Sequence, residues 1–178
     1  MEPFDRWADQ EYTAAVRLFA LVPQTLFFAL AVPVALVTGG RRADEALGLP
    51  RFDRGPVGAL GSPVAALGLT FATWSIAVQF VRGEGTPVPR IPTQELVADG
   101  PYRYSRNPMS FGTTLYYLGV SLRAGSPSAV CLTGLFTASQ VAYIKRVEER
   151  ELEDRFGGAY REYRERTPFY VPRPGRER

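Results

Sequence analysis

The sequence contains no histidine and a single cysteine, Cys131. Without histidine, the usual zinc sites, histidine-ligated haem, and nucleophilic catalysis by Ser-His or Cys-His pairs are all excluded. One cysteine cannot form a disulfide within the chain, and its place in an apolar block is typical of a small core residue. These absences remove most of the common types of enzyme active site.

The basic excess is small, with 21 Lys and Arg against 18 Asp and Glu, and ten of the basic residues follow Ile144. A nucleic-acid-binding protein would be expected to carry such a patch on a soluble scaffold with elements that read or stack bases. Here the charged stretches alternate with long apolar blocks, although the mean hydropathy is only −0.10. We therefore expect anionic lipid headgroups as partners and no nucleic acid.

Two apolar blocks near the front are long enough to cross a bilayer as helices. The first covers residues 14–38 and contains Pro23 and Pro33, which are expected to bend it. Its length and the acidic residues before it are unlike a cleaved signal peptide. The second covers residues 56–81 and is rich in small residues, which predicts a helix packed closely against its neighbours. Its G-A-L-G run at 58–61 is interpreted as packing within the monomer.

A third apolar region is divided by the break R-A-G-S-P at 123–127. One long span would place Arg123 at mid-membrane, which is costly, so the region predicts a hairpin of two helices. The fold class is thus all-α, a single domain over residues 1–178 with about four membrane spans and an amphipathic carboxyl-terminal helix. The basic residues of loop 82–108 and of the tail place both in the cytoplasm, against the four arginines of the first loop (Arg41, Arg42, Arg51, Arg54).

The segment G-P-Y-R-Y-S-R-N-P-M-S-F-G at 100–112 precedes this hairpin. Asn107 is a favoured N-cap and Pro108 a favoured first helical residue, so a helix is predicted to begin there. Its positive dipole end suits a polar or anionic ligand group. Because a hairpin returns to its starting face, Glu148 and Glu149 are expected near this segment, where they could bind a cation or sugar hydroxyls.

The acidic pair also fits a simpler interpretation. Residues 145–166 read as an amphipathic helix at the membrane surface, with Leu152, Phe156, Tyr160 and Tyr163 facing lipid and the charges facing water. Charge runs of this kind usually mark solvated faces. Periodicity alone leaves both interpretations open.

The two motifs together resemble the family of integral-membrane methyltransferases that includes isoprenylcysteine carboxyl methyltransferase and the bacterial phospholipid N-methyltransferases. Those proteins share the pattern G-x-Y-R-Y-x-R-[HN]-P-x-Y-x-G before a hairpin and E-E-x-x-L-x-x-x-F-G-x-x-Y-x-x-Y after it. The resemblance covers residues 83–172, whereas the front spans at 14–81 match only in being hydrophobic. Ser110 departs from the pattern's tyrosine, so either Tyr102 or Tyr104 is expected to supply the missing phenol, or the substrate pocket differs.

The resemblance implies S-adenosylmethionine, bound at the cytoplasmic face. It implies a cofactor site made by Gly83, Gly85, Tyr102, Tyr104, Arg106, Asn107, Pro108, Met109, Gly112, Glu148 and Glu149. For Gly83 and Gly85, which stand where the phospholipid enzymes have a G-x-G motif, a plain loop is an equal alternative. Tyrosine faces and carboxylates suit a sulfonium cation.

Methyl transfer depends mainly on positioning the acceptor, so the family's chemistry needs no histidine. A lipid-borne carboxylate acceptor would need only an arginine to orient it, Arg103 or Arg106. An amine acceptor, such as a phospholipid headgroup, must lose a proton, for which Glu149 is the candidate base. For Arg103, a headgroup clamp is an equal alternative.

Two other classes of protein remain as alternatives. Membrane sterol and enone reductases have a related carboxyl-terminal fold and would bind NADPH instead. A membrane scaffold without enzymatic activity would use the 100–109 segment for partner association alone.

Overall fold

The computed structural model describes residues 14–52, 55–82 and 95–173, and every element within them is helical. The elements in chain order are α2 (Ala14–Leu26), the π-helical turn η1 (Phe27–Ala31), α3 (Val32–Leu47), α4 (Pro56–Arg82), the 3-10 turn η2 (Gly100–Arg103), α5 (Pro108–Arg123), α6 (Pro127–Tyr143), the π-helical turn η3 (Ile144–Glu148) and α7 (Glu149–Arg166). The prediction of an all-α fold is confirmed for these residues.

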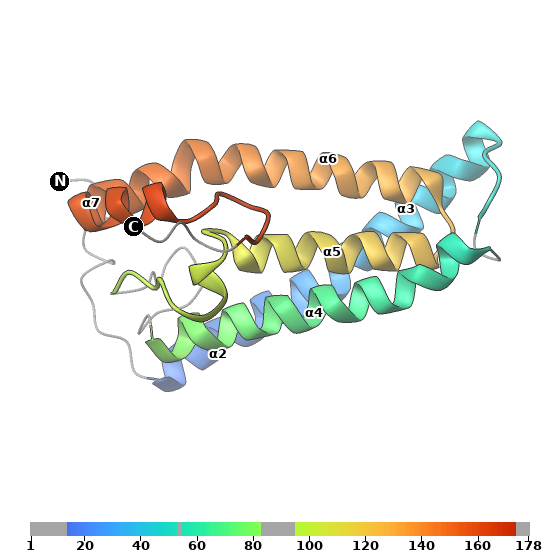
Figure 1. Cartoon of the computed structure of the whole chain (residues 1–178). Coiled ribbons are helices and arrows are strands. Elements are labelled where there is room, and N and C mark those ends of the chain that lie inside the picture. The colour runs from blue at the N-terminus through green and yellow to red at the C-terminus, as the bar shows by residue number, and fades with distance from the viewer. Residues whose placement is uncertain (1–13, 53–54, 83–94, 174–178) are drawn as a thin grey trace.

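The helices form an elongated bundle with α5 between α4 and α6 (Figure 1). The α2–η1–α3 helix runs behind α4 and α5, and α3 packs on α6 and α5. One end of the bundle holds η2, α7 and the carboxyl-terminal segment, and the other holds the α3–α4 and α5–α6 connections. The predicted hairpin of α5 and α6 is present.

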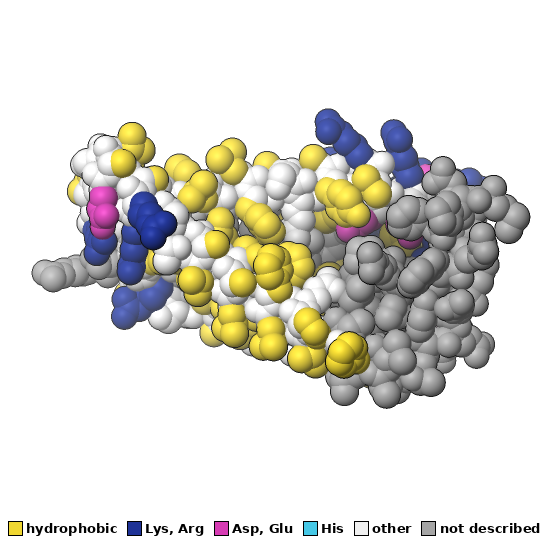
Figure 2. All heavy atoms as spheres, turned by 180° about the vertical axis from the view of Figure 1, so that it is seen from behind, with side chains coloured by type: hydrophobic (Ala, Val, Ile, Leu, Met, Phe, Trp, Pro, Cys, Tyr) yellow, Lys and Arg dark blue, Asp and Glu magenta, His cyan; other side chains and the backbone are white. Residues whose placement is uncertain are grey.

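Within the part of the chain that the structure describes, two helices are long and apolar enough to cross a membrane, Leu21–Leu47 and Pro56–Arg82. Their large apolar side chains are exposed; Leu30, Val34 and Leu67, for example, are 58–62% accessible. Figure 2 shows hydrophobic side chains over the middle of the bundle and Lys and Arg side chains at its ends. This distribution fits a chain whose middle lies in lipid and whose ends meet water.

The α4–α5 contact is made backbone to backbone through small residues. Gly61, Gly68 and Ala72 of α4 face Gly119 and Gly112 of α5. A Cβ added to Gly68 would lie 2.3 Å from the backbone nitrogen of Tyr116, and one added to Gly119 would lie 2.2 Å from that of Ala65. The prediction of close packing by the second apolar block, with Gly61 used inside the monomer, is confirmed.

The first apolar helix is irregular where Pro33 removes a backbone donor. Pro33 has no N–H for the carbonyl four residues back, at Ala29, and the preceding turn widens to π geometry. Hydroxyls from α5 supply the missing donors: Tyr116 donates to the Ala29 carbonyl at 2.8 Å, and Tyr117 donates to the Phe28 carbonyl at 2.7 Å. The freed backbone carbonyls of this apolar helix are thereby satisfied.

The first helix also extends further than residues 14–38, because it ends only at Leu47, where Gly48 adopts a left-handed conformation with φ 66°. Arg41 and Arg42 therefore lie on a helix and not in a loop, contrary to the prediction. Asp44, which is 2% exposed, explains the extra turns: its carboxylate accepts hydrogen bonds from the Ser126 hydroxyl and, at 2.9 Å, from the Ser128 amide. This holds the last turns of α3 against the start of α6.

Replacing Gly68 with alanine should destabilise the bundle, because the added Cβ would meet backbone atoms that cannot move without separating α4 from α5. We expect a loss of about 1–3 kcal/mol, measured as a lower midpoint of thermal unfolding in detergent. Gly134→Ala on α6 is the matched control, since a Cβ there meets nothing within 4 Å. Equal midpoints for the two variants would contradict the close approach.

Candidate active site

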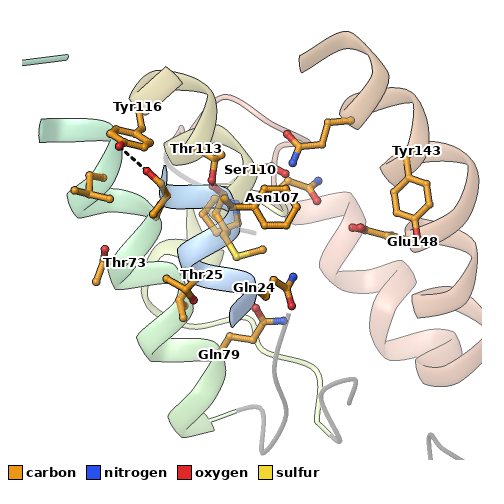
Figure 3. Close-up of a pocket in the computed structure, with 18 of the residues that line it drawn as sticks. Gln24, Thr25, Thr73, Gln79, Asn107, Ser110, Thr113, Tyr116, Tyr143 and Glu148 are labelled. Carbon is orange, nitrogen blue, oxygen red and sulfur yellow. Dashed lines mark hydrogen bonds between the residues drawn. The ribbon is translucent and has the colours of Figure 1, made fainter. Parts of the chain in front are cut away.

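A cavity of about 600 Å³ lies at the η2–α7 end of the bundle, between α2, α4, the start of α5 and the long α6–η3–α7 helix. Figure 3 shows Gln24 and Thr25 of α2 with Thr73 and Gln79 of α4 on one side, and Tyr143 and Glu148 on the other. Asn107, Ser110 and Thr113 lie between them. The apolar part of the lining includes Leu21, Phe28, Leu69 and Phe136. The cavity thus has the size and mixed lining of a small-molecule site.

A shielded ion pair joins the two sequence motifs beside this cavity. Arg106 Nη1 donates to Glu149 Oε1, and the two side chains are only 12% and 17% exposed. The Tyr160 hydroxyl donates to the same carboxylate oxygen at 3.2 Å. The Phe169 ring lies 5.4 Å from the Arg106 guanidinium carbon. The start of α5 and the acidic pair after α6 therefore meet at one end of the bundle, as the sequence predicted.

The π turn η3 decides which acidic residue faces the cavity. In an uninterrupted helix, the residue seven positions after Gln140 would lie about 20° from it, on the same face. The π turn adds one residue, so Glu148 takes this position in place of Val147. Glu148 lines the cavity, whereas Val147 is 43% exposed.

The Glu148 carboxyl lies in an acidic and aromatic environment. Burial, and then the charge of Glu151, raises the pKa of Glu148 above the usual range of glutamate. Burial, followed by the Glu148 charge, likewise raises the pKa of Tyr102. The Tyr102 hydroxyl donates to Gln79 Oε1 at 3.0 Å. Glu148 is thus a carboxylate that can accept a proton more readily than an exposed glutamate.

The α7 helix breaks at Gly157, and the residues after the break turn toward the bundle. Gly157 has φ 52° and ψ −119°, a conformation outside the reach of other residues without strain, and it breaks the helix after two turns. Tyr160 is therefore 1% exposed beneath the ion pair, and the Tyr163 hydroxyl donates to the Tyr102 carbonyl at 2.7 Å. The interpretation that placed Tyr160 and Tyr163 toward lipid is wrong, because it assumed one unbroken helical period.

The chain after α7 fastens the 104–107 loop. The Pro168 carbonyl accepts from the Arg106 amide at 2.8 Å, and the Phe169 carbonyl accepts from Asn107 Nδ2 at 2.9 Å. Asn107 is the N-cap residue of α5 as predicted, with Pro108 following it, but its side chain makes this contact instead of a capping hydrogen bond. The segment after α7 therefore holds the loop in place at the start of α5.

Tyr170 supplies a phenol beside Ser110. Its hydroxyl lies 2.7 Å from Thr114 Oγ1 and donates to the Ser110 carbonyl at 3.1 Å, and its ring meets Phe111 edge-on. The sequence predicted that Tyr102 or Tyr104 would fill this place or that the substrate pocket would differ. Tyr170 was missed because it lies sixty positions further along the chain.

The predicted site residues divide into three groups. The first group lines the cavity and consists of Tyr102, Arg106, Asn107, Pro108, Met109 and Glu148. Glu149 contacts this group through its ion pair with Arg106. Arg103 and Tyr104 are exposed on η2 and the residue after it, outside the cavity lining, and Gly112 packs on Ala72 of α4. Gly83 and Gly85 lie outside the described residues.

Two buried polar atoms at the cavity have no hydrogen-bond partner in the described part of the chain, Arg106 Nε and Gln140 Oε1. A buried donor or acceptor left unpaired is costly, and both side chains belong to the cavity lining. Sequence reasoning missed Gln140. A polar amide inside an otherwise apolar block was the available signal.

Comparison with protein families identifies the class to which this arrangement belongs. A model of the phospholipid methyltransferase family matches residues 57–159, more than half of the chain. The chain therefore belongs to the phospholipid methyltransferase family, whose members are membrane methyltransferases acting on phospholipid-type substrates. Searches of curated proteins and of solved structures found no significant match.

Replacing one partner of the shielded Arg106–Glu149 pair should lower the unfolding free energy much more than replacing one partner of an exposed ion pair. Glu149→Gln leaves Arg106 charged and largely desolvated, so we expect a loss of about 3 kcal/mol in unfolding free energy. Glu153→Gln is the control, because its arginine partners are 41–59% exposed and such pairs contribute less than about 1 kcal/mol. Chemical unfolding in detergent measures both, and equal losses would contradict a buried pair.

Proposed function

We propose that the protein transfers a methyl group from S-adenosylmethionine to an amine carried by a membrane lipid. The observation that carries the proposal is the cavity in which Glu148 faces the Arg106–Asn107–Pro108 corner, in a chain of the phospholipid methyltransferase family. S-adenosylmethionine, when bound, supplies a methyl group on a sulfonium that an amine can displace in line. The protein's own residues would bind the cofactor, orient the lipid amine and remove its proton.

The cavity residues fit such a cofactor. Arg106 Nε is a buried donor without a partner, and it would donate to the cofactor's carboxylate. The Tyr102 ring would offer an aromatic face to the positive sulfonium part. The volume of about 600 Å³ lies within the range of pockets that hold ligands of this size.

The charges at the cavity favour an amine over a carboxylate acceptor. Among its described lining residues only Arg106 and Glu148 are charged, and Arg106 is already paired with Glu149. The uncompensated charge is therefore the negative one of Glu148, which attracts an ammonium group and repels a carboxylate. An isoprenylcysteine-type acid would need a free arginine, and Arg103 is exposed on η2, away from the lining.

In the proposed reaction Glu148 takes a proton from the lipid ammonium. The neutral nitrogen would then be placed for in-line attack on the methyl group that S-adenosylmethionine would supply, which would leave a methylated ammonium and a neutral thioether. The sequence assigned the base to Glu149. We propose Glu148 instead, because the Glu149 carboxylate is occupied by Arg106 and Tyr160.

We further propose that α5 and α6 cross the membrane together with the two longer helices, which makes four spans. The basic residues of the tail then put the η2–α7 end, and the cofactor, at the cytoplasmic face. The lipid acceptor would reach the cavity sideways, since the apolar helices α2 and α4 form part of its wall.

Purified protein in nanodiscs should bind S-adenosylmethionine in a calorimetric titration. Arg106→Lys retains a positive charge near Glu149 but removes the Nε donor, so we expect affinity to fall about tenfold. Arg150→Lys, at an exposed position, is the control and should bind like the wild type. Binding of a reduced nicotinamide cofactor with no binding of S-adenosylmethionine would favour the reductase alternative and reject this proposal.

Methyl transfer to an amine phospholipid should fall as the pH drops through the raised pKa of Glu148, because a protonated carboxyl cannot accept the proton. Glu148→Gln should lose about 10²-fold in rate and lack this acid limb. In Glu151→Gln one cause of the raised pKa is gone, so the limb should move to lower pH. Labelled methyl incorporation across pH measures this, and an unchanged limb in Glu148→Gln would exclude Glu148 as the base.

A further inference from the structure

Tyr170 contacts the chain on both sides of the 106–109 corner, whose four residues line the cavity. Before the corner, the Tyr170 carbonyl accepts from the Ser105 hydroxyl at 2.7 Å. The oxygen of Ser105, a fully buried residue, accepts in turn from the Asn107 amide at 3.1 Å. After the corner, the Tyr170 hydroxyl donates to the Ser110 carbonyl at 3.1 Å. One residue thus holds the chain where it enters and where it leaves the corner.

The Tyr170 hydroxyl also connects the corner to α6. Its oxygen lies 2.7 Å from Thr114 Oγ1, which lies 3.1 Å from Thr137 Oγ1 of α6. The single phenol proton goes to the Ser110 carbonyl, so the Tyr170 oxygen must accept from Thr114. Thr114 has then used its own proton and must accept from Thr137. The hydroxyls form a chain with one direction, from α6 to the first turn of α5, and this chain passes through Tyr170.

The start of α5 depends on these contacts because its own cap is missing. Asn107 is the N-cap residue, but its side chain makes no capping hydrogen bond. Instead, the segment after α7 lies against the start of α5 and supplies the contacts (Figure 1). This segment also lies beyond residues 57–159, which the family model matches. The corner is therefore held by a part of the chain outside that match.

We propose that Tyr170 is a positioning residue for the cofactor, which holds the 106–109 corner in the conformation that binds S-adenosylmethionine. This inference rests on the proposed function, in which Arg106 contacts the cofactor. Tyr170 and Ser105 are not among the described residues that line the cavity, so they act through the corner and not by touching a ligand. Groups that bind a ligand must be held to within about 0.5 Å by such supporting contacts.

The experiment compares two hydroxyl deletions in the full-length protein in nanodiscs. Tyr170→Phe removes the phenol oxygen and keeps the ring and the backbone carbonyl. Thr133→Val is the matched control, because Thr133 Oγ1 and Ser121 Oγ form a buried pair 3.0 Å apart that also joins α5 to α6, toward the opposite end of the bundle. The midpoint of thermal unfolding should fall by a similar amount in both variants.

Calorimetric titration then separates positioning from general stability. The dissociation constant for S-adenosylmethionine should rise about tenfold in Tyr170→Phe and stay as in the wild type in Thr133→Val. At saturating cofactor, the acid limb of the rate should not move in Tyr170→Phe, since Glu148 belongs to η3 and not to the corner. Ser105→Ala removes the contact on the other side of the corner and should weaken cofactor binding in the same way, which provides a second test if Tyr170→Phe fails to fold.

The possible failures are distinguishable. Wild-type affinity in both Tyr170→Phe and Ser105→Ala, or an equal loss of affinity in Thr133→Val, overturns the inference alone. A wild type that does not bind S-adenosylmethionine overturns the proposed function as well.

Discussion

The ion pair between Arg106 and Glu149 is the interaction on which the candidate site depends. It joins residues 43 positions apart, one just before α5 and one at the start of α7, and it is shielded from water on both sides. Separating the pair would leave a desolvated charge without a partner, which costs free energy. The pair therefore favours the arrangement in which the α5–α6 hairpin returns the chain to this end of the bundle. The pair also neutralises Arg106, which leaves Glu148 as the one uncompensated charge among the described residues that line the cavity.

Both π turns of the described chain border the cavity, and each one determines which groups can contact it. At η1, Pro33 frees carbonyls that Tyr116 and Tyr117 of α5 then satisfy, and Phe28 and Ala29 of this turn line the cavity. At η3, the extra residue brings Glu148 to the face of Gln140. Irregular turns of this type cost little when their freed groups find partners, and they place side chains where a regular helix could not.

The sequence predicted the features that depend on local chemistry or on the hairpin. Small residues in α4 indicated its close packing, Asn107-Pro108 indicated the start of α5, and the hairpin brought Glu149 to Arg106. It could not predict the features that depend on a change of helical phase. The π turn at η3 and the break at Gly157 decide which of two adjacent glutamates faces the cavity and where Tyr160 points, and neither changes the composition of the helix.

The position of the charge in the cavity connects the fold to the choice of acceptor. An acid raised in pKa by burial and by Glu151 is unfavourable for stability at neutral pH, since its charged form is desolvated and lies beside a like charge. A cationic ligand removes that disadvantage by compensating the charge, whereas an anionic ligand would increase it. In the proposed reaction this carboxylate would favour an ammonium group over an anion, and its raised pKa would suit it to take a proton from the amine.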